Sequence, residues 1–321
     1  MARSGVTRRG ALGAVGAAGA AALIGCGPAG DRGRREADVI ILGAGLSGLN
    51  AAMILEEMGL DVLVLDAAER VGGRLKTLSD LPGAPEAGGQ QIGAGYGRVR
   101  GRALDAGLSF EDFPPNRFGE VLALGDTLIA AEDWPSHRLN TLPQDWKAIA
   151  PSRLFFSLAA PANPLEDVYA WMEPGAAAHD VSARDWLAAR GANDEALRLM
   201  NVSLNGRDLA SYSMINVFRS LALYVQERAM GPSQGLAGGA QRLPEAMAAA
   251  LARPVRTGAR AVMIEADAAG AQVALDSGET LRADFVLSAL PFAVMRAMAV
   301  RAPLSGLQRE AIAEMAYTPI V

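Results

Sequence analysis

The sequence predicts an α/β protein in which a mainly helical segment is inserted between two parts of a sheet-containing domain. Three observations support this. An apolar run rich in Val and Ile at 37–41 precedes a helical pattern at 49–58 and a second apolar run at 62–65. Helical patterns then dominate from 101 to 230, and short alternating strand patterns return after residue 231. Continuous apolar runs are typical of strands buried on both faces of a parallel sheet, so we expect a parallel strand–helix–strand unit first.

The loop between the first strand and the first helix carries three spaced glycines, Gly43, Gly45 and Gly48. In such a loop the first glycine permits a tight turn, the second lets a pyrophosphate approach the backbone, and the third lets the helix pack on the strand. The N–H groups at the helix start, those of Leu46 and Ser47, favour phosphate binding. Asp66 ends the second strand, where a carboxylate accepts hydrogen bonds from an adenosine ribose. The order of these elements predicts a Rossmann-like dinucleotide-binding domain.

The stretch DAAERVGGR at 66–74 contains a second glycine pair and Arg74, which an NAD site does not require. Residues 39–77, from VIILGAGLSGLNAA through ERVGGRLKT, closely resemble the flavin-containing, monoamine oxidase-like amine oxidase family. The resemblance implies FAD as the cofactor in preference to NAD, with Gly73 and Arg74 against its pyrophosphate. The chemistry agrees, because glycines let the chain pass close to a ligand and an Arg fork complements phosphate oxygens.

A second block resembles the family segment that runs beside the isoalloxazine ring. It consists of Gly88, Gly89, Gln90 and Gln91, continuing to Arg98. The family usually has an aromatic residue where Gln91 stands and a proline where Ala94 stands. The resemblance therefore implies the path of the backbone here, while the contacts to the ring are left open.

A third block, GLAGGAQRL at 235–243, resembles a glycine-rich helix entry of the family. Short strands are expected at 255–264, 272–275 and 281–283, and the resemblance implies that the backbone of Val262 contacts adenine. Residues 283–291 resemble a buried family strand that returns to the main sheet.

Composition and charge exclude several function classes. The 321 residues are 50% hydrophobic and 20% charged, which is typical of a globular protein, and the net charge of −5 does not suggest a nucleic-acid partner. The single cysteine, Cys26, excludes an intramolecular disulfide. His137 and His179 stand apart from other potential ligands, so we expect no metal site, and no Ser-His-Asp arrangement is evident.

The first residues are typical of an export signal. Arg8 and Arg9 precede an Ala- and Gly-rich apolar run at 10–25, which favours a twin-arginine signal over a general secretory one, although both interpretations remain open. The run is too short and too weakly apolar to predict a membrane span. Leu23 to Cys26 resembles a lipobox, which implies cleavage before Cys26 and a lipid on its sulfur. We therefore expect a protein that is exported and lipid-anchored on the outer face of a bacterial membrane.

The expected divisions are a signal peptide at 1–25, a linker at 26–36, FAD-binding segments at 37–100 and 231–321, and a helical substrate domain at 101–230. Four tryptophans fall in the helical domain and are expected to pack in its core or at an interface, namely Trp134, Trp146, Trp171 and Trp186. Helices are expected at 182–189, opened by a Ser-x-x-Asp cap, and at 214–227.

The resemblance implies an FAD-dependent oxidase that removes hydride from the carbon bearing an amine, in an amine or amino acid, with oxygen reoxidising the flavin. An alternative is a desaturase or protoporphyrinogen-oxidase-like enzyme, and another is an anchored flavin-binding fragment without catalysis. No catalytic residue is assigned. The segment 315–321 reads as the beginning of a strand that continues in the family, so we expect the 321 residues alone to bind FAD weakly and to oxidise no amine.

Overall fold

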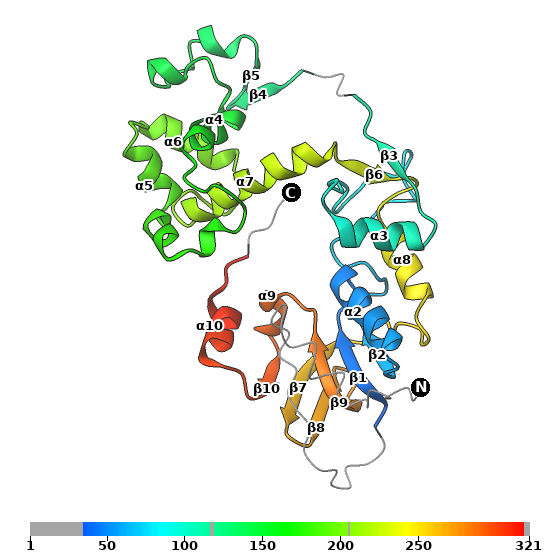
Figure 1. The fold of residues 1–321 in the computed structure, drawn as a ribbon. Helices are drawn as coiled ribbons and strands as arrows, with labels where there is room; N and C mark the ends of the chain where they lie inside the picture. Colours follow the sequence, from blue (N-terminus) through cyan, green and yellow to red (C-terminus); the bar gives the residue numbers. More distant parts are fainter. Residues whose placement is uncertain (1–34, 116–118, 205, 318–321) are drawn as a thin grey trace, which may run out of the picture. The chain divides into compact units, whose positions relative to one another are not determined.

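The computed structural model describes residues 35–115, 119–204 and 206–317. The expected signal peptide and Cys26 lie outside these residues. The chain divides into two compact units. The first contains residues 35–92, 96–112 and 234–316, and the second contains residues 93–95 and most of 113–233 (Figure 1).

A six-stranded sheet forms the framework of the first unit. Its strand order is β10-β7-β8-β9-β1-β2. The strands are β1 (Ala37–Leu42), β2 (Val62–Leu65), β7 (Ala261–Asp267), β8 (Gly270–Leu275), β9 (Thr280–Ser288) and β10 (Ala299–Arg301). β1 lies between β2 and β9 and is parallel to both, and every residue of β1 is buried. The two strands expected at 37–41 and 62–65 are thereby confirmed.

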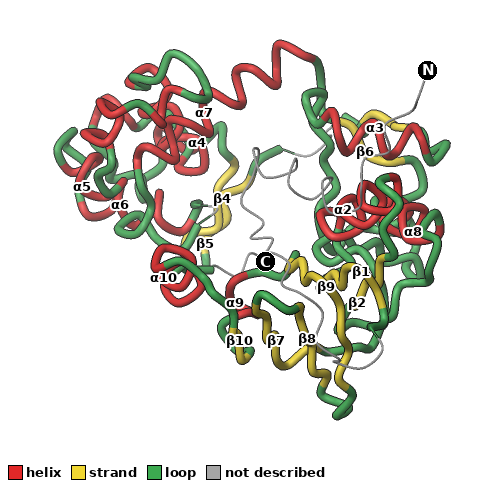
Figure 2. The backbone as a smooth tube through the Cα atoms, turned by 60° about the horizontal axis from the view of Figure 1, so that its bottom comes forward, coloured by secondary structure: helices red, strands yellow, loops and turns green. Residues whose placement is uncertain are grey.

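The two faces of β1 contribute to different cores. Val39 and Ile41 pack with Leu49 of helix α2 (Leu46–Glu57) and with Leu243 of helix α8 (Arg242–Ala249). Figure 2 shows both helices beside β1 and β2. Side chains alternate between the faces of a strand, so Ile40 and Leu42 instead pack with residues of the antiparallel strands β7, β8 and β9. This two-sided burial explains the continuous apolar run in the sequence.

Strand β9 differs from the sequence expectation, which treats 281–283 and 283–291 as separate segments. β9 is one strand, because its first part pairs with β8 and its second part pairs with β1, with Ala283 in both ladders. The strand expected at 255–264 also differs, since β7 begins only at Ala261. Arg256 lies instead beside Leu65, in a single parallel bridge at the edge of β2.

The expected domain boundaries at 101 and 230 fall elsewhere in the structure. Helix α3 (Gly97–Asp105) and strand β3 (Phe110–Asp112) belong to the first unit, because β3 pairs with β6 (Gln234–Leu236). This pairing joins segments more than a hundred residues apart, which local patterns do not reveal. The first unit also contains α9 (Phe292–Met295) and α10 (Gly306–Glu314).

The second unit is mainly helical. Its helices are α4 (Pro151–Ala159), α5 (Ala183–Ala188), α6 (Asp194–Val202) and α7 (Met214–Met230), with a hairpin of β4 (Val121–Leu124) and β5 (Thr127–Ala130) and several short 3₁₀ turns. The Ser182 hydroxyl accepts a hydrogen bond from the N–H of Asp185 (3.0 Å), so the expected cap of α5 is confirmed.

The core of the second unit contains three of the four tryptophans. Trp134, Trp146 and Trp186 are buried in it, whereas Trp171 is exposed and lies near the Arg219 guanidinium. His179 packs edge-on against the ring of Phe218. Within the described part of the chain, no helix is both long and apolar enough to cross a bilayer.

Candidate functional site

The glycines of the β1–α2 loop differ in what surrounds them. At Gly43 the backbone has φ +101°, a conformation that L side chains rarely adopt. A Cβ at Gly48 would overlap the carbonyl oxygen of Gly43, so the third glycine allows α2 to lie against the loop. A Cβ at Gly45 would meet nothing within 4 Å, which leaves open space above the helix start.

The start of α2 has backbone N–H groups without partners inside the helix. Gly45 is the N-cap, no side chain caps the helix, and its first turn contains no acidic residue. The first N–H groups of an α-helix have no partner within the helix, and they attract anions. The backbone at Leu46 and Ser47 therefore has the donors that a phosphate needs, in the place the sequence predicts.

Asp66 lies across the same loop. Its two carboxylate oxygens accept hydrogen bonds from the N–H groups of Ala44 (2.7 Å) and Ala68 (2.8 Å). Each oxygen of an ionised carboxylate can accept a further bond. Asp66 is thus held in a fixed orientation and can still accept from a pair of ribose hydroxyls.

The second glycine pair lies directly against the first loop. Gly72 and Gly73 have φ +107° and +55°, and the N–H of Gly72 donates to the carbonyl of Ala44 (2.8 Å). A Cβ at Gly73 would lie 3.5 Å from the Cα of Gly45. The side chain of Arg74 is exposed, and no described residue bonds to it, so its guanidinium can bind an anion.

The block at 88–91 runs antiparallel to the chain that follows the glycine pair. The N–H of Gly89 donates to the carbonyl of Arg74 (3.0 Å), and a Cβ at Gly88 would overlap that same carbonyl oxygen. The side chains of Gln90 and Gln91 are exposed. The structure thus brings this block beside the Gly72–Gly73 turn.

The third glycine-rich block closes against the other two. A Cβ at Gly239 would lie 2.6 Å from the side chain of Thr77. The N–H of Ala240 donates to a Glu86 carboxylate oxygen (2.6 Å), and Glu86 also accepts from the Thr77 hydroxyl (3.0 Å). Thr77 in turn accepts from the N–H of Gln241 (3.1 Å). Thr77, Glu86 and Gln241 were not singled out from the sequence, because single polar residues near glycines do not indicate partners so far along the chain.

Val262 lies beside a cavity next to the first loop. The register of β7 and β8 shifts between Ala261 and Met263, so Val262 has no partner opposite it in β8. The cavity measures about 270 Å³ and its lining is largely apolar, including Gly43, Leu65, Ala67, Val262 and Leu290. A bulge leaves the backbone groups of the extra residue unpaired. The structure thus places Val262, at an irregularity of the β7–β8 pairing, beside an apolar space.

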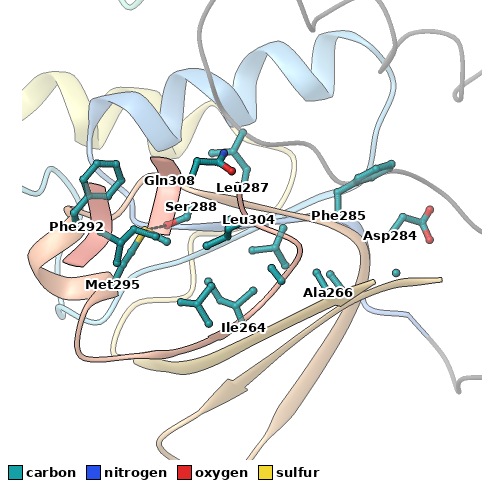
Figure 3. A pocket seen from close by; sticks show the side chains of 16 residues that line it. Ile264, Ala266, Asp284, Phe285, Leu287, Ser288, Phe292, Met295, Leu304 and Gln308 are labelled. Atoms are coloured by element: carbon teal, nitrogen blue, oxygen red, sulfur yellow. Dashed lines mark hydrogen bonds between the residues drawn. The ribbon is translucent and has the colours of Figure 1, made fainter. Parts of the chain in front are cut away.

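A second cavity, about 160 Å³, lies between strands β7 and β9 and helices α9 and α10 (Figure 3). Its lining is mostly apolar, and the Ser288 hydroxyl within it donates to the sulfur of Met295 (3.4 Å). None of the predicted site residues lines this cavity.

One ion pair flanks the site, and the described chain shows no metal centre. Arg256 lies beside Leu65, a residue of the cavity lining, and pairs with Glu279, which lowers the pKa of the Glu279 carboxyl. Both groups are exposed, so we assign the pair little stabilisation. Across the described ranges, no three His, Cys, Asp or Glu side chains come together as a metal site would require.

The chain is similar in sequence to known flavin-containing amine oxidases. The AofH protein of Mycobacterium tuberculosis, whose name describes a flavin-containing monoamine oxidase, is 29% identical to this chain over 281 residues. The match covers 79% of this chain and 57% of the AofH protein. Amine oxidase A of Sus scrofa, also flavin-containing, is 40% identical over 72 residues, 22% of this chain and 14% of its own.

Solved structures give a similar result. Putrescine oxidase bound to putrescine matches with a TM-score of 0.62 and 26% identity, over 86% of this chain and 63% of that one. Cyclohexylamine oxidase from Brevibacterium oxydans shares the fold, with a TM-score of 0.63 at 24% identity and coverage of 86% and 63%. The chain thus spans less than two thirds of these relatives.

A family model described as flavin containing amine oxidoreductase matches residues 46–321, which is most of the chain. The match includes the start of α2, the Gly72–Gly73 turn, and the blocks at 88–91 and 235–243. FAD is the cofactor that this family and this loop arrangement indicate. The chain belongs to the flavin containing amine oxidoreductase family.

Proposed function

We propose that the first unit is a Rossmann-like FAD-binding domain and that the protein is an FAD-dependent oxidoreductase acting on an amine. The observation that carries the proposal is the packing of three glycine-rich segments around the Gly72–Gly73 turn, which lies against Gly45 at the N-cap of α2. The segment at 88–91 bonds to Arg74 and the start of α8 bonds to Val71, although both lie far from the first loop in the sequence. The helical second unit is the corresponding candidate for a substrate domain.

The residues present fit the parts of FAD. The N–H groups at Leu46 and Ser47, together with the unbonded Arg74 guanidinium, suit a pyrophosphate. Asp66 suits the adenosine ribose, and the apolar cavity beside Val262 suits adenine. The exposed segment at 88–91 is the candidate contact for the isoalloxazine ring.

The bound cofactor would supply the oxidation itself, by accepting hydride from the carbon that bears the amine and passing electrons to oxygen. The protein holds this cofactor, orients it and excludes water. An amine is the favoured substrate class because putrescine oxidase, solved with putrescine, shares both the fold and 26% identity.

The proposal is tested first by flavin content. The purified chain should absorb near 450 nm and release FAD on denaturation, and a panel of primary amines should then be assayed for amine-dependent peroxide. Release of NADP without flavin would refute the cofactor. Because the 321 residues alone are expected to oxidise no amine, the substrate class is tested on a chain extended to the length of the matched relatives. FAD content of that extended chain with no amine-dependent reduction of the flavin would refute the substrate class.

Asp66→Ala should weaken FAD binding about tenfold or more, because hydrogen bonds to a charged group each contribute about 1.5–3 kcal/mol. FAD affinity is measured by titrating the apoprotein at a temperature well below its unfolding. Asp61→Ala is the matched control, since Asp61 pairs with Arg253 at the opposite end of β2. Equal affinities for the two variants would contradict the assignment of Asp66.

Export and anchoring are further parts of the proposal. Arg8→Lys combined with Arg9→Lys should leave the protein in the cytoplasm, because a flavoprotein folded around its cofactor suits the twin-arginine route. Cys26→Ala should abolish labelling with a radioactive fatty acid. Unchanged export of the double Lys variant in cell fractions would indicate the general secretory route instead.

A further inference from the structure

The side chain of Arg70 lies within the turn that contains the second glycine pair. Its Nη1 donates to the carbonyls of Val71 (3.0 Å) and Leu75 (2.8 Å) and to Oε1 of Gln241 (3.2 Å). Its Nη2 donates to the carbonyl of Gly73 (2.8 Å). All four acceptors are neutral, and among the described residues no carboxylate pairs with Arg70. The guanidinium therefore organises the turn, and no described carboxylate pairs with it there.

Gln241 completes this arrangement from the start of α8. Its Nε2 donates to the carbonyl of Val71 (2.9 Å) while its Oε1 accepts from Arg70. A Cβ at Gly72 would lie 2.9 Å from Pro244 of α8 and 3.2 Å from the Gln241 amide. The turn is thus held from inside by Arg70 and from α8 by Gln241.

The turn needs such support because its two glycines have the widest conformational freedom of any residues. The backbone carbonyl groups of the turn that point toward Arg70 also need hydrogen-bond donors. Once the turn is fixed, the N–H of Gly72 reaches the carbonyl of Ala44, and Gly73 lies against Gly45 of the phosphate-binding loop. The position of Arg74 follows from the position of this turn.

We propose that Arg70 and Gln241 are positioning residues, which hold the turn at residues 72–74 in the shape that receives the cofactor's pyrophosphate. Neither touches the reacting atoms. The inference rests on the proposed FAD site, and it adds two residues that act through Arg74 and the glycine pair. A planar guanidinium with five donors can bind four acceptors at once, whereas an ammonium group cannot reproduce that fork.

The first experiment is a double-mutant cycle on FAD affinity with Arg70→Met and Arg74→Met. Arg70→Met should weaken FAD binding about 30-fold, as expected for losing a charged group that organises several hydrogen bonds. In the Arg74→Met background the same substitution should weaken FAD binding only about threefold, because both residues act through one turn. Additive effects of the two substitutions would overturn the proposal.

The matched control is Arg253→Met. Arg253 also donates to a backbone carbonyl, that of Glu36 (2.8 Å), and pairs with Asp61 at the other end of the strands. The FAD affinity of the Arg253→Met protein should stay within about twofold of the parent's.

Arg70→Lys keeps the positive charge but not the planar fork of donors, so its FAD affinity should remain about tenfold below the parent's. An Arg70→Lys protein with the parent's FAD affinity would show that a positive charge alone is enough for binding. That result would overturn the positioning role.

A readout without flavin separates this inference from the proposed function. Amide hydrogen exchange of the peptide covering residues 70–76 should be at least about tenfold faster in apo Arg70→Met and Gln241→Met than in apo Arg253→Met. Unchanged exchange of this peptide in the two variants would refute the positioning role of Arg70 and Gln241, even if the protein binds FAD. Faster exchange in the two variants, together with a parent protein that binds no FAD, would refute the proposed function and leave the positioning role of Arg70 and Gln241 standing.

Discussion

Gly48→Ala is expected to leave the FAD-binding unit largely unfolded or unable to retain flavin. The added Cβ would overlap the carbonyl oxygen of Gly43 and lie 3.4 Å from the Cβ of Ala289. The overlapping atom belongs to the backbone, so the methyl group fits only if α2 moves away from β1. Overpacking in a dense core costs about 1–3 kcal/mol, and a backbone clash belongs at or above the upper end. Thermal unfolding followed by circular dichroism measures the effect.

Gly97→Ala provides the control for this experiment. Gly97 begins α3 in the same unit, and a Cβ there would meet nothing within 4 Å. Because Ala has the higher helix propensity, the control should unfold at the parent temperature or slightly above it. A Gly48→Ala protein with parental unfolding temperature and flavin content would show that α2 does not pack on the loop as described.

Gly45→Ser is expected to separate folding from cofactor binding. Gly45 has extended backbone angles and is the N-cap of α2, a position where Ser is at least as favourable as Gly. The apoprotein should therefore keep its stability or gain a few tenths of a kcal/mol. The new side chain would nevertheless occupy the open space above the helix start and compete for its N–H groups, so FAD affinity should fall about 100-fold.

The measurement pairs an FAD titration with thermal unfolding of the apoprotein. Gly97→Ser introduces the same side chain in equally open surroundings outside the site, and its FAD affinity should match the parent. If Gly45→Ser binds FAD as tightly as Gly97→Ser, then the pyrophosphate does not approach the backbone at Gly45, and the assigned binding mode is wrong.

Local sequence signals were sufficient for the features that depend on neighbouring residues. The apolar runs of β1 and β2 are readable because both faces of a parallel strand are buried. Glycine spacing around Gly43 and Gly48 is readable because steric overlap acts over a few residues. The Ser182 cap is likewise a contact across three residues. The family resemblance at 39–77 and 88–98 then indicated FAD, through residues that the structure brings together.

The tertiary structure alone decided the contacts between distant segments. The pairing of β3 with β6 moves the first domain boundary from 101 to beyond Asp112. β9 becomes a single strand only because β8 and β1 pair with its successive halves.

The roles of Arg70 and Gln241 likewise depend on a hydrogen bond across 171 positions. A polar side chain has many equivalent partners in an extended sequence, and only the packing of α8 against the Gly72–Gly73 turn selects one of them. The sequence by itself therefore determined strands β1 and β2 and the glycine spacing of the first loop, and its family resemblance indicated the cofactor. The folded chain determined the long-range contacts that surround the Gly72–Gly73 turn.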